Sequence, residues 1–224
     1  MRIGSFEKMN YKKEIIRTIQ ELSGRYSYSE IFSDWVKSCA LTISNCTDLI
    51  HGQVWKEREK NYIGIMQKYN SDERKKFVEM LGLLTIALEE ITDVLGQIYM
   101  EGNIGSKITG QFFTPFHISE LCAKTSMLTE ISEEKPFHLY EPSSGSGGMI
   151  IAAIKTVKEM GKNPQRCMEI RAQDLDWRGV YMTYTQLSLL GVKATVIQGD
   201  SLARISGKSD QIFYTPAKKG LLLW

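Results

Sequence analysis

The spacing of apolar residues changes near Gly110, and this change constrains the fold more than any other feature of the chain. Up to about Met100 the apolar residues recur every three or four positions, which is typical of helices that bury one side. After Gly110, short apolar runs alternate with amphipathic segments of helix length, which indicates a layered α/β architecture. With 42% hydrophobic residues among 224, the chain can form a substantial core. We therefore predict an α/β protein with a helical N-terminal domain over 1–108 and a sheet-containing domain over 109–224.

The first half predicts at least three helices. Two apolar stripes define two of them, and the second stripe runs without a break over three heptads. The stripes consist of Phe32, Trp35, Cys39, Ile43, Cys46 and Ile50, and of Phe77, Leu81, Leu84, Leu88, Ile91, Leu95 and Ile98. Residues 70–73 supply a cap and an acidic first turn, Gly102 supplies an end, and 55–69 fit a helix between the two. The second stripe also fits a coiled coil, but packing within the domain is the commoner outcome.

The second half predicts four strands that alternate with helices. We place the strands at 137–141, 167–174, 193–198 and 211–214. One helix is expected over 148–160, and another carries Val180, Tyr184 and Leu187 on one face and ends at Gly191.

A Ser/Gly-rich run, YEPSSGSGGM at 140–149, separates the first predicted strand from the helix that follows. Such a run is either a flexible linker or the floor of a cofactor pocket. Its position inside one strand–helix unit favours the pocket, because glycines let a ligand approach the backbone and the helix N–H groups point at it. A single GxG after a strand is nevertheless a weak signal by itself.

Neighbouring residues narrow the choice of ligand. A P-loop is excluded, because no Lys-Ser or Lys-Thr pair follows Gly148. NAD is less favoured, since Ile150 stands where its fingerprint has a third glycine. Asp174 and Asp200 follow the second and third strands, where carboxylates can hold a ribose diol or accept from an adenine amino group. Each aspartate taken alone fits a helix cap or a turn equally well.

Composition argues against several classes of protein. A net charge of +2 gives no basic excess that would predict nucleic-acid binding by itself. Four cysteines (Cys39, Cys46, Cys122 and Cys167) and three histidines lack metal-ligand spacing, so we predict free thiols and no metal site. No stretch approaches the ~20 apolar residues of a membrane span, and the N-terminus lacks the apolar core of a signal peptide. We expect a soluble, cytoplasmic protein.

Four stretches resemble the adenine-specific (N6) DNA methyltransferases, most closely the modification subunit of type I restriction systems. They are Ile98-Tyr99, GQFFTP at 110–115, EPSSGSGGM at 141–149, and AQD at 172–174 together with IQGDSL at 197–202. The resemblance covers the chain from Ile91 to Asp210. It implies a partial Rossmann-like sheet with the strand order 3-2-1-4, S-adenosylmethionine as the cofactor and DNA as the substrate.

The resemblance also implies a set of cofactor-binding residues. These are Phe113, Thr114, Glu141, Pro142, Gly145, Gly147, Asp174 and Asp200. Thr114 would bind the methionine carboxylate of the cofactor, Asp174 the ribose hydroxyls and Asp200 the adenine ring. Phe112 and Phe113 fit core positions as well, and Thr114-Pro115 fit the start of a helix.

The chain departs from the family after the fourth strand. The family holds a flipped-out adenine in an Asn-Pro-Pro-aromatic loop, whose oxygens accept the amino hydrogens and whose ring stacks on the base. Here Thr215, Pro216, Ala217 and Lys218 occupy these positions. Thr215 and Pro216 are the counterparts of catalytic residues, but a hydroxyl is a poorer acceptor than an amide oxygen. Two hypotheses follow: an adenine methyltransferase, or an inactive relative that acts as a cofactor-binding or interaction protein.

The last expectation concerns partners. Further strands and a target-recognition region, which the family implies, do not follow in this sequence. We therefore expect DNA to be bound through a complex. An open sheet edge would be covered by the N-terminal helices, by the apolar tail at 221–224, or by another chain such as a specificity-type subunit or a second copy.

Overall fold

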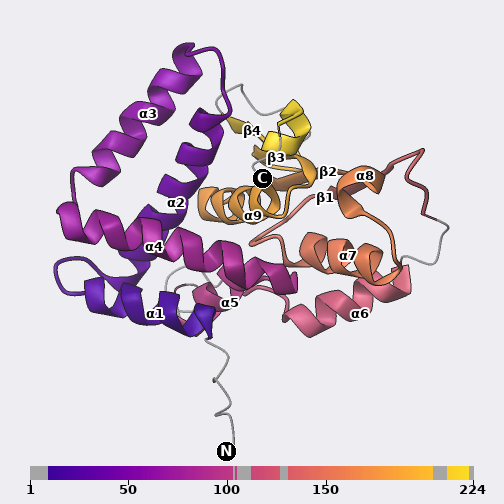
Figure 1. The fold of residues 1–224 in the computed structure, drawn as a ribbon, viewed down its shortest axis with the longest axis horizontal. Coiled ribbons are helices and arrows are strands. Elements are labelled where there is room, and N and C mark those ends of the chain that lie inside the picture. Colours follow the sequence, from indigo (N-terminus) through magenta and orange to yellow (C-terminus); the bar gives the residue numbers. More distant parts are fainter. Residues whose placement is uncertain (1–9, 103, 105–111, 127–130, 204–210, 222–224) are drawn as a thin grey trace, which may run out of the picture.

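The computed structural model describes residues 10–102, 104, 112–126, 131–203 and 211–221, which form a helical region beside a four-stranded sheet (Figure 1). The first helices are α1 (Tyr11–Leu22), α2 (Tyr28–Cys46), α3 (Gln53–Met66), α4 (Ser71–Ala87), the 3-10 helix η1 (Leu88–Glu90) and α5 (Val94–Glu101). They are followed by α6 (Phe116–Ser126), β1 (Phe137–Glu141), α7 (Gly148–Glu159), α8 (Pro164–Cys167), β2 (Met168–Asp174), α9 (Trp177–Leu189), β3 (Lys193–Gln198), β4 (Ile212–Tyr214) and η3 (Pro216–Lys219). The predicted α/β class and the four strands are confirmed.

The sheet has the order β1-β2-β3-β4, so the predicted order 3-2-1-4 is wrong. The first three strands are parallel, whereas β4 runs antiparallel to β3. Contacts from the helices hold β4 at this edge. Phe213 is buried against the rings of Tyr181 and Tyr184 in α9. Arg58 of α3 donates to the carbonyl of Ile212 (3.2 Å).

One hydrophobic core joins the helical region to the sheet. α2 packs against α9 and α6 packs against α7 (Figure 1). Trp35, Leu95, Ile150 and Val196 come from both halves of the chain and belong to the same buried cluster. The predicted boundary between 108 and 109 lies outside the described residues, so the division into two domains stays a prediction.

The second apolar stripe does not form one helix, contrary to the prediction. α4 ends at Ala87, η1 follows, and Ile91 adopts a left-handed backbone with a φ of 46°. Asp93 then caps α5 by accepting from the Gly96 N–H (2.9 Å). A β-branched residue rarely has a positive φ, so contacts elsewhere in the molecule must hold this kink. The kink carries Asp93 into the interior, where it is 3% exposed.

The first stripe also ends earlier than predicted, because α2 stops at Cys46 and Ile50 is 84% exposed. The predicted cap of α4 is confirmed, since Asn70 accepts from the N–H groups of Asp72 and Glu73. Within the described ranges, no helix has the length and apolar character needed to cross a bilayer. Residues 110–111 of the GQFFTP stretch and 222–224 of the apolar tail lie outside those ranges.

Candidate functional site

The Ser/Gly-rich run forms a tight loop between β1 and α7. Residues 144–148 are all buried, so the run is not a flexible linker. Gly145 and Gly147 have φ angles of 54° and 95°, which residues with a Cβ rarely adopt. A Cβ at position 145 would also lie 2.9 Å from the ring of Phe113. Glycine is therefore required at these two positions by backbone shape, and at 145 also by close packing.

Two buried polar side chains of α9 form hydrogen bonds to the backbone carbonyls of this loop. Thr183 donates to the carbonyl of Gly145 (3.0 Å). Gln186 donates to the carbonyl of Ser146 (2.8 Å). Both side chains are fully buried, and they lie one turn apart on the same helix. Neither residue was predicted from the sequence, although two polar residues three positions apart in an apolar helix are a recognisable signal.

Asp174 fastens the loop to the end of β2. Its Oδ2 accepts from the Gly145 N–H (2.6 Å), and its Oδ1 accepts from the Asp176 N–H (2.8 Å). The residue is only 7% exposed. The Gly199 N–H donates to the Asp174 carbonyl (2.9 Å), which joins the ends of β2 and β3. Asp174 thus determines the shape of the loop, a function that its ribose-binding prediction did not include.

The other predicted carboxylates lie at the same edge of the sheet and are more exposed. Glu141 ends β1 and accepts from the Ser143 N–H (3.1 Å), while Pro142 between them is exposed. Asp200 follows β3, is exposed and accepts from the Leu202 N–H (2.9 Å), as a turn residue would. The structure therefore gathers the loop glycines and all three predicted carboxylates at the carboxyl edge of the parallel strands.

An aromatic pair covers one side of the loop. The ring of Phe113, which is half-buried, lies 4.8 Å from that of the buried Tyr99, measured between centroids. The Arg178 guanidinium lies over the Tyr99 ring (5.7 Å). Thr114 is exposed, and α6 begins two residues later. Phe113 therefore combines the two roles considered for it, since it packs on the core and borders the loop.

Asp93, which lies at the kink before α5, also contacts the loop. Its Oδ2 accepts from the Ser146 hydroxyl (2.5 Å), and its Oδ1 accepts from the Gln186 amide (2.9 Å) and the Gly96 N–H (2.9 Å). A Cβ on Gly148, the first residue of α7, would lie 3.0 Å from Oδ2. Burial raises the pKa of Asp93, and the hydrogen bonds from Gln186, Ser146 and Gly96 act in the opposite direction. The sequence analysis missed Asp93, although Thr-Asp before an apolar run is a helix-capping signal.

Thr215 and Pro216, the predicted counterparts of catalytic residues, lie at the opposite end of the strands from the Ser/Gly-rich loop. Thr215 is fully buried at the start of β3, where its hydroxyl donates to the Val192 carbonyl (2.7 Å) and accepts from the Ala194 N–H (2.9 Å). Because β4 runs antiparallel to β3, its end lies at the amino edge of the sheet. Lys218 pairs there with Glu169.

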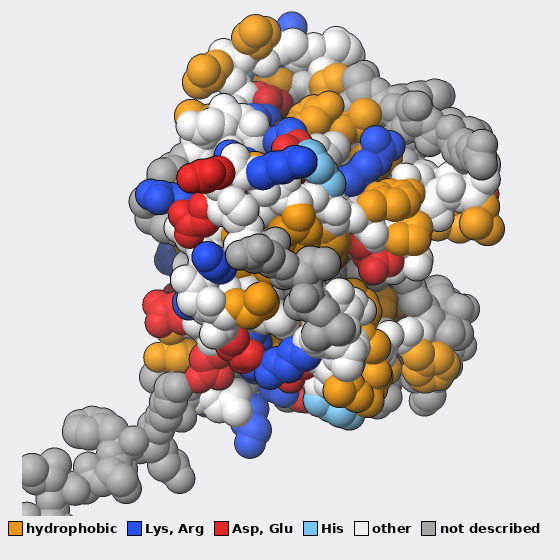
Figure 2. All heavy atoms as spheres, turned by 90° about the vertical axis from the view of Figure 1, so that its right-hand side faces the viewer, with side chains coloured by type: hydrophobic (Ala, Val, Ile, Leu, Met, Phe, Trp, Pro, Cys, Tyr) orange, Lys and Arg blue, Asp and Glu red, His pale blue; other side chains and the backbone are white. Residues whose placement is uncertain are grey.

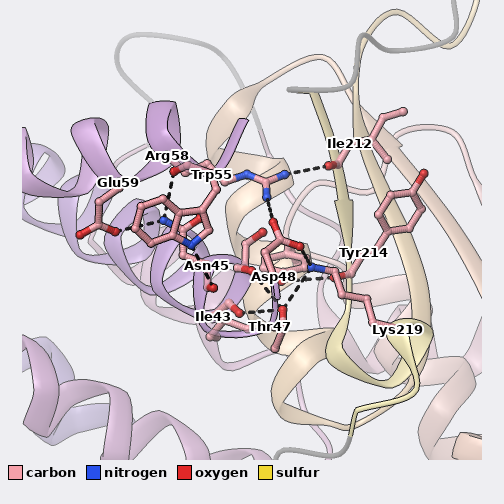
Figure 3. Close-up of polar contacts among 12 residues, drawn as sticks. Ile43, Asn45, Thr47, Asp48, Trp55, Arg58, Glu59, Ile212, Tyr214 and Lys219 are labelled. Carbon is pink, nitrogen blue, oxygen red and sulfur yellow. Dashed lines mark hydrogen bonds and ion pairs between the residues drawn. The ribbon is translucent and has the colours of Figure 1, made fainter. Parts of the chain in front are cut away.

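A polar cluster joins β4 and η3 to the hairpin of α2 and α3, and it extends along β4 from the amino edge (Figure 3). Arg58 donates to the Asp48 carboxylate (2.9 Å) and lies over the ring of Phe213 (4.7 Å). Lys219 forms an ion pair with the other oxygen of Asp48. Asn45 extends the cluster by donating to Glu59 (3.1 Å). We call Asp48, Arg58 and Lys219 the amino-edge clamp.

The face that carries α6 shows no surface charge of a single sign. Figure 2 shows acidic and basic side chains interspersed there with hydrophobic ones. Leu121 of α6 and Tyr140 of β1 are 59% and 53% exposed. Charge on this face therefore gives no sign of a DNA-binding patch.

A family model described as N-6 DNA Methylase matches residues 90–216 of the chain. The type I restriction enzyme MjaIX methylase subunit of Methanocaldococcus jannaschii is 25% identical over 120 residues. That match covers 50% of this chain and 20% of the relative, so the chain spans about one fifth of that protein's length.

A solved structure from Listeria monocytogenes, assigned to the class I S-adenosylmethionine-dependent methyltransferases, has a similar fold. The TM-score is 0.51 at 13% sequence identity, and the match covers 87% of this chain and 55% of the other. Both the helical region and the sheet thus have counterparts in one methyltransferase architecture.

Proposed function

Since this chain belongs to the N-6 DNA methylase family, we propose that it binds S-adenosylmethionine at the loop between β1 and α7 and serves DNA adenine methylation within a larger assembly. One observation carries the proposal. The loop is fixed by Asp174 and α9 at the carboxyl end of the parallel strands and leads directly into the N-terminus of α7, which is where folds of this kind bind their cofactor.

We assign the contacts to the cofactor as follows. Gly145 and Gly147 would give the loop its shape through their positive φ angles, and Phe113 would border the ligand. Asp200 is exposed and has acceptor capacity left for an adenine amino group. Asp174 uses one lone pair of each oxygen on the backbone, so a ribose hydroxyl would share a carboxylate that already holds the loop.

Thr114 and Glu141 would meet the methionine end of the cofactor. Thr114 is exposed where the chain enters α6, and its hydroxyl can donate to a carboxylate. Glu141 is half-buried at the end of β1, and its carboxylate can accept from an amino group.

The methyl-transfer step needs acceptors for the amino hydrogens of adenine, because its nitrogen lone pair is delocalised into the ring. When bound, S-adenosylmethionine supplies an activated methyl group on its sulfonium. The Thr215 hydroxyl is fully buried and engaged at the opposite edge of the sheet. This favours the second candidate function, in which the chain binds the cofactor and leaves base capture to another subunit or performs none.

The partner proposal rests on the named relative and on the sheet. That relative is the methylase subunit of a type I restriction enzyme. Among the described residues, the outer edge of β1 pairs with no other strand, and such an edge is normally covered. We propose that the chain works with a specificity-type subunit that delivers DNA, or with a second copy of itself.

Calorimetric titration of the purified chain tests the cofactor. We expect S-adenosylmethionine to bind and NAD to give no signal, and no binding of either would contradict the proposal. Incubation with labelled cofactor and adenine-rich duplex DNA then separates the two candidate functions. Methyl transfer by the chain alone would rule out the second candidate.

A further inference from the structure

We propose that single-stranded nucleic acid binds to the face of the sheet that points away from α9, which we call the open face. Two exposed tyrosine rings on this face stack on bases, and three cationic side chains bind phosphates. The inference goes beyond the proposed function, because it requires neither S-adenosylmethionine nor methyl transfer.

The strand register separates the two faces of the sheet. Side chains that are paired across neighbouring strands point to the same side, and successive residues of one strand alternate between the sides. Ile170, Ala194 and Val196 point to one side and are buried. Phe213 pairs with Val196 and packs on Tyr184 of α9, so this is the side that α9 covers. The residues between them point to the open face.

The open face consists of two rows of mostly polar side chains. The first row is His138, Glu169 and Lys193, and the second is Tyr140, Arg171, Thr195 and Tyr214. Glu169 and Thr195 are half-buried, and the others are exposed. In a mainly parallel sheet both faces are normally buried and apolar. Charged and hydroxyl-bearing side chains are costly to bury under an apolar partner, so this face suits a polar, hydrated ligand.

Cations outnumber carboxylates on the open face. Arg171 and Lys193 belong to the two rows, and in the described part of the chain neither forms an ion pair. Lys218 reaches the first row from η3 and pairs with Glu169, the one carboxylate of these rows. The hydrogen bond from Lys218 lowers the pKa of Glu169, and His138 and Lys193 act in the same direction. A positive excess therefore remains at neutral pH after this pair has formed.

This excess is a local feature of the sheet. The side of the molecule that carries α6 mixes both signs of charge (Figure 2), so the argument rests on the composition of the two rows and not on a broad basic surface. Phosphates match such a cluster, because lysine and arginine side chains replace their counterions.

The two tyrosine rings lie at opposite ends of the second row. Tyr140 is 53% exposed and Tyr214 is 43% exposed. Three strand spacings of ~4.8 Å place the two rings about 14 Å apart, with Arg171 and Thr195 between them. The Arg171 guanidinium lies over the Tyr140 ring (6.0 Å). Aromatic rings that alternate with cations across a sheet bind unpaired bases of any sequence, whereas the bases of a duplex are already stacked on one another.

Fluorescence anisotropy with labelled strands of about 20 nucleotides tests the proposal on the purified chain. We expect single-stranded DNA or RNA to bind about tenfold more tightly than a duplex of the same sequence, and the tighter of the two identifies the ligand. The logarithm of the affinity should fall with the logarithm of the salt concentration with a slope of about 2, as for three phosphate contacts. Absence of binding, or equal binding of the duplex, would overturn the proposal.

Tyr140→Ala should weaken the binding of single strands about tenfold, because it removes a stacking ring. Tyr140→Phe is the matched control, since it keeps the ring and removes only the long hydrogen bond that the hydroxyl donates to Gln173 (3.4 Å). Its affinity should stay within about twofold of wild type. Unchanged binding by Tyr140→Ala with an unchanged urea midpoint would contradict the proposal, as would an equal loss in both variants.

Arg171→Gln and Lys193→Gln should each weaken binding about threefold and lower the salt slope by about 0.7. Lys75→Gln, which changes an exposed lysine on α4, should leave both quantities unchanged. If the open face is instead covered by a second copy of the chain, wild type should self-associate, Tyr140→Ala should not, and no strand should bind; that result would overturn the proposal. These measurements contain no cofactor, so their outcome is independent of the titration with S-adenosylmethionine.

Discussion

The two edges of the sheet are each tied to the helical region by an aspartate, and the two aspartates differ in their partners. At the amino edge, Asp48 pairs with Arg58 and Lys219, so the clamp contains its own cations. At the carboxyl edge, Asp93 is more deeply buried and is held by neutral donors only. The Asp48 carboxylate is thus compensated by opposite charge, whereas the oxygens of Asp93 are satisfied by hydrogen bonds alone and burial raises its pKa.

Asp174→Ala should have the largest effect and would test how far the carboxyl edge depends on one carboxylate. The buried N–H of Gly145 and the N–H of Asp176 would lose their acceptors, which should cost about 3 kcal/mol of stability in urea unfolding. Cofactor affinity should fall on the order of 100-fold, because the loop loses its shape.

Asp200→Ala is the companion variant for this prediction. Its carboxylate is exposed and caps a turn, so unfolding should change by less than about 0.5 kcal/mol. Weakened cofactor binding with unchanged stability would assign Asp200 to the ligand. No change in binding would leave it as a turn residue.

Gly145→Ala should destabilise the protein by about 2 kcal/mol and weaken binding of the cofactor. A Cβ there meets both an unfavourable φ and the Phe113 ring at 2.9 Å. Gly161→Ala is the matched control, since its φ is also positive but its Cβ would have open space around it. It should cost about 1 kcal/mol and leave binding intact. Equal losses would mean that the contact with Phe113 is unimportant.

Arg58→Met should affect the amino edge alone. The change removes the ion pair with Asp48 and the hydrogen bond to Ile212, at an expected cost of about 2 kcal/mol in urea unfolding. Cofactor affinity should not change, because the clamp residues bind one another and the carbonyl of Ile212, and not the loop between β1 and α7. Arg17→Met, which removes the exposed ion pairs of Arg17 with Glu14 and Glu21 on α1, should stay within about 0.5 kcal/mol of wild type. A loss of affinity in Arg58→Met would contradict the independence of the two edges.

The smallest effects should be two pH dependences of opposite sign. Burial raises the pKa of Asp93, so its contribution to stability is fully present below its unfolded pKa and is lost as pH rises through the folded pKa. The bond from Lys218 lowers the pKa of Glu169, so that contribution is present above its unfolded pKa and is lost as pH falls. Unfolding of Asp93→Asn and Glu169→Gln across pH 3–8 should show differences from wild type that run in opposite directions. Parallel trends would contradict this assignment.

The sequence predicted secondary structure correctly in segments where a single helical or strand spacing of apolar residues continues to a clear turn signal. The strand at 193–198 and the start of α7 at Gly148 agree with the structure because alternation and turn residues act over a few positions. The break after Leu88 was missed because the apolar spacing continues across it, and only the cap at Asp93 marks it. The strand order was wrong because pairing of β4 depends on Phe213 and Arg58, a contact that no local pattern encodes.

The site residues also fall into two groups: those marked by local sequence signals, and those whose positions depend on contacts between distant segments. The glycines and the carboxylates at the ends of strands are local signals, and the fold brings them together. The place of Thr215 at the other end of the strands could not be read from the sequence, because it depends on β4 running antiparallel to β3. Gln186 and Thr183 were missed because their partners lie in a loop about forty residues earlier in the chain.

The left-handed backbone of Ile91 has a consequence for the order in which the chain acquires its structure during synthesis. The apolar spacing favours one straight helix from residue 71 to 101, and within that segment only the cap at Asp93 favours a break. The Gln186 side chain that holds the kink from the other side lies 93 positions further along. As the chain leaves the ribosome, the contact between Asp93 and Gln186 can therefore form only after α9 has been synthesised.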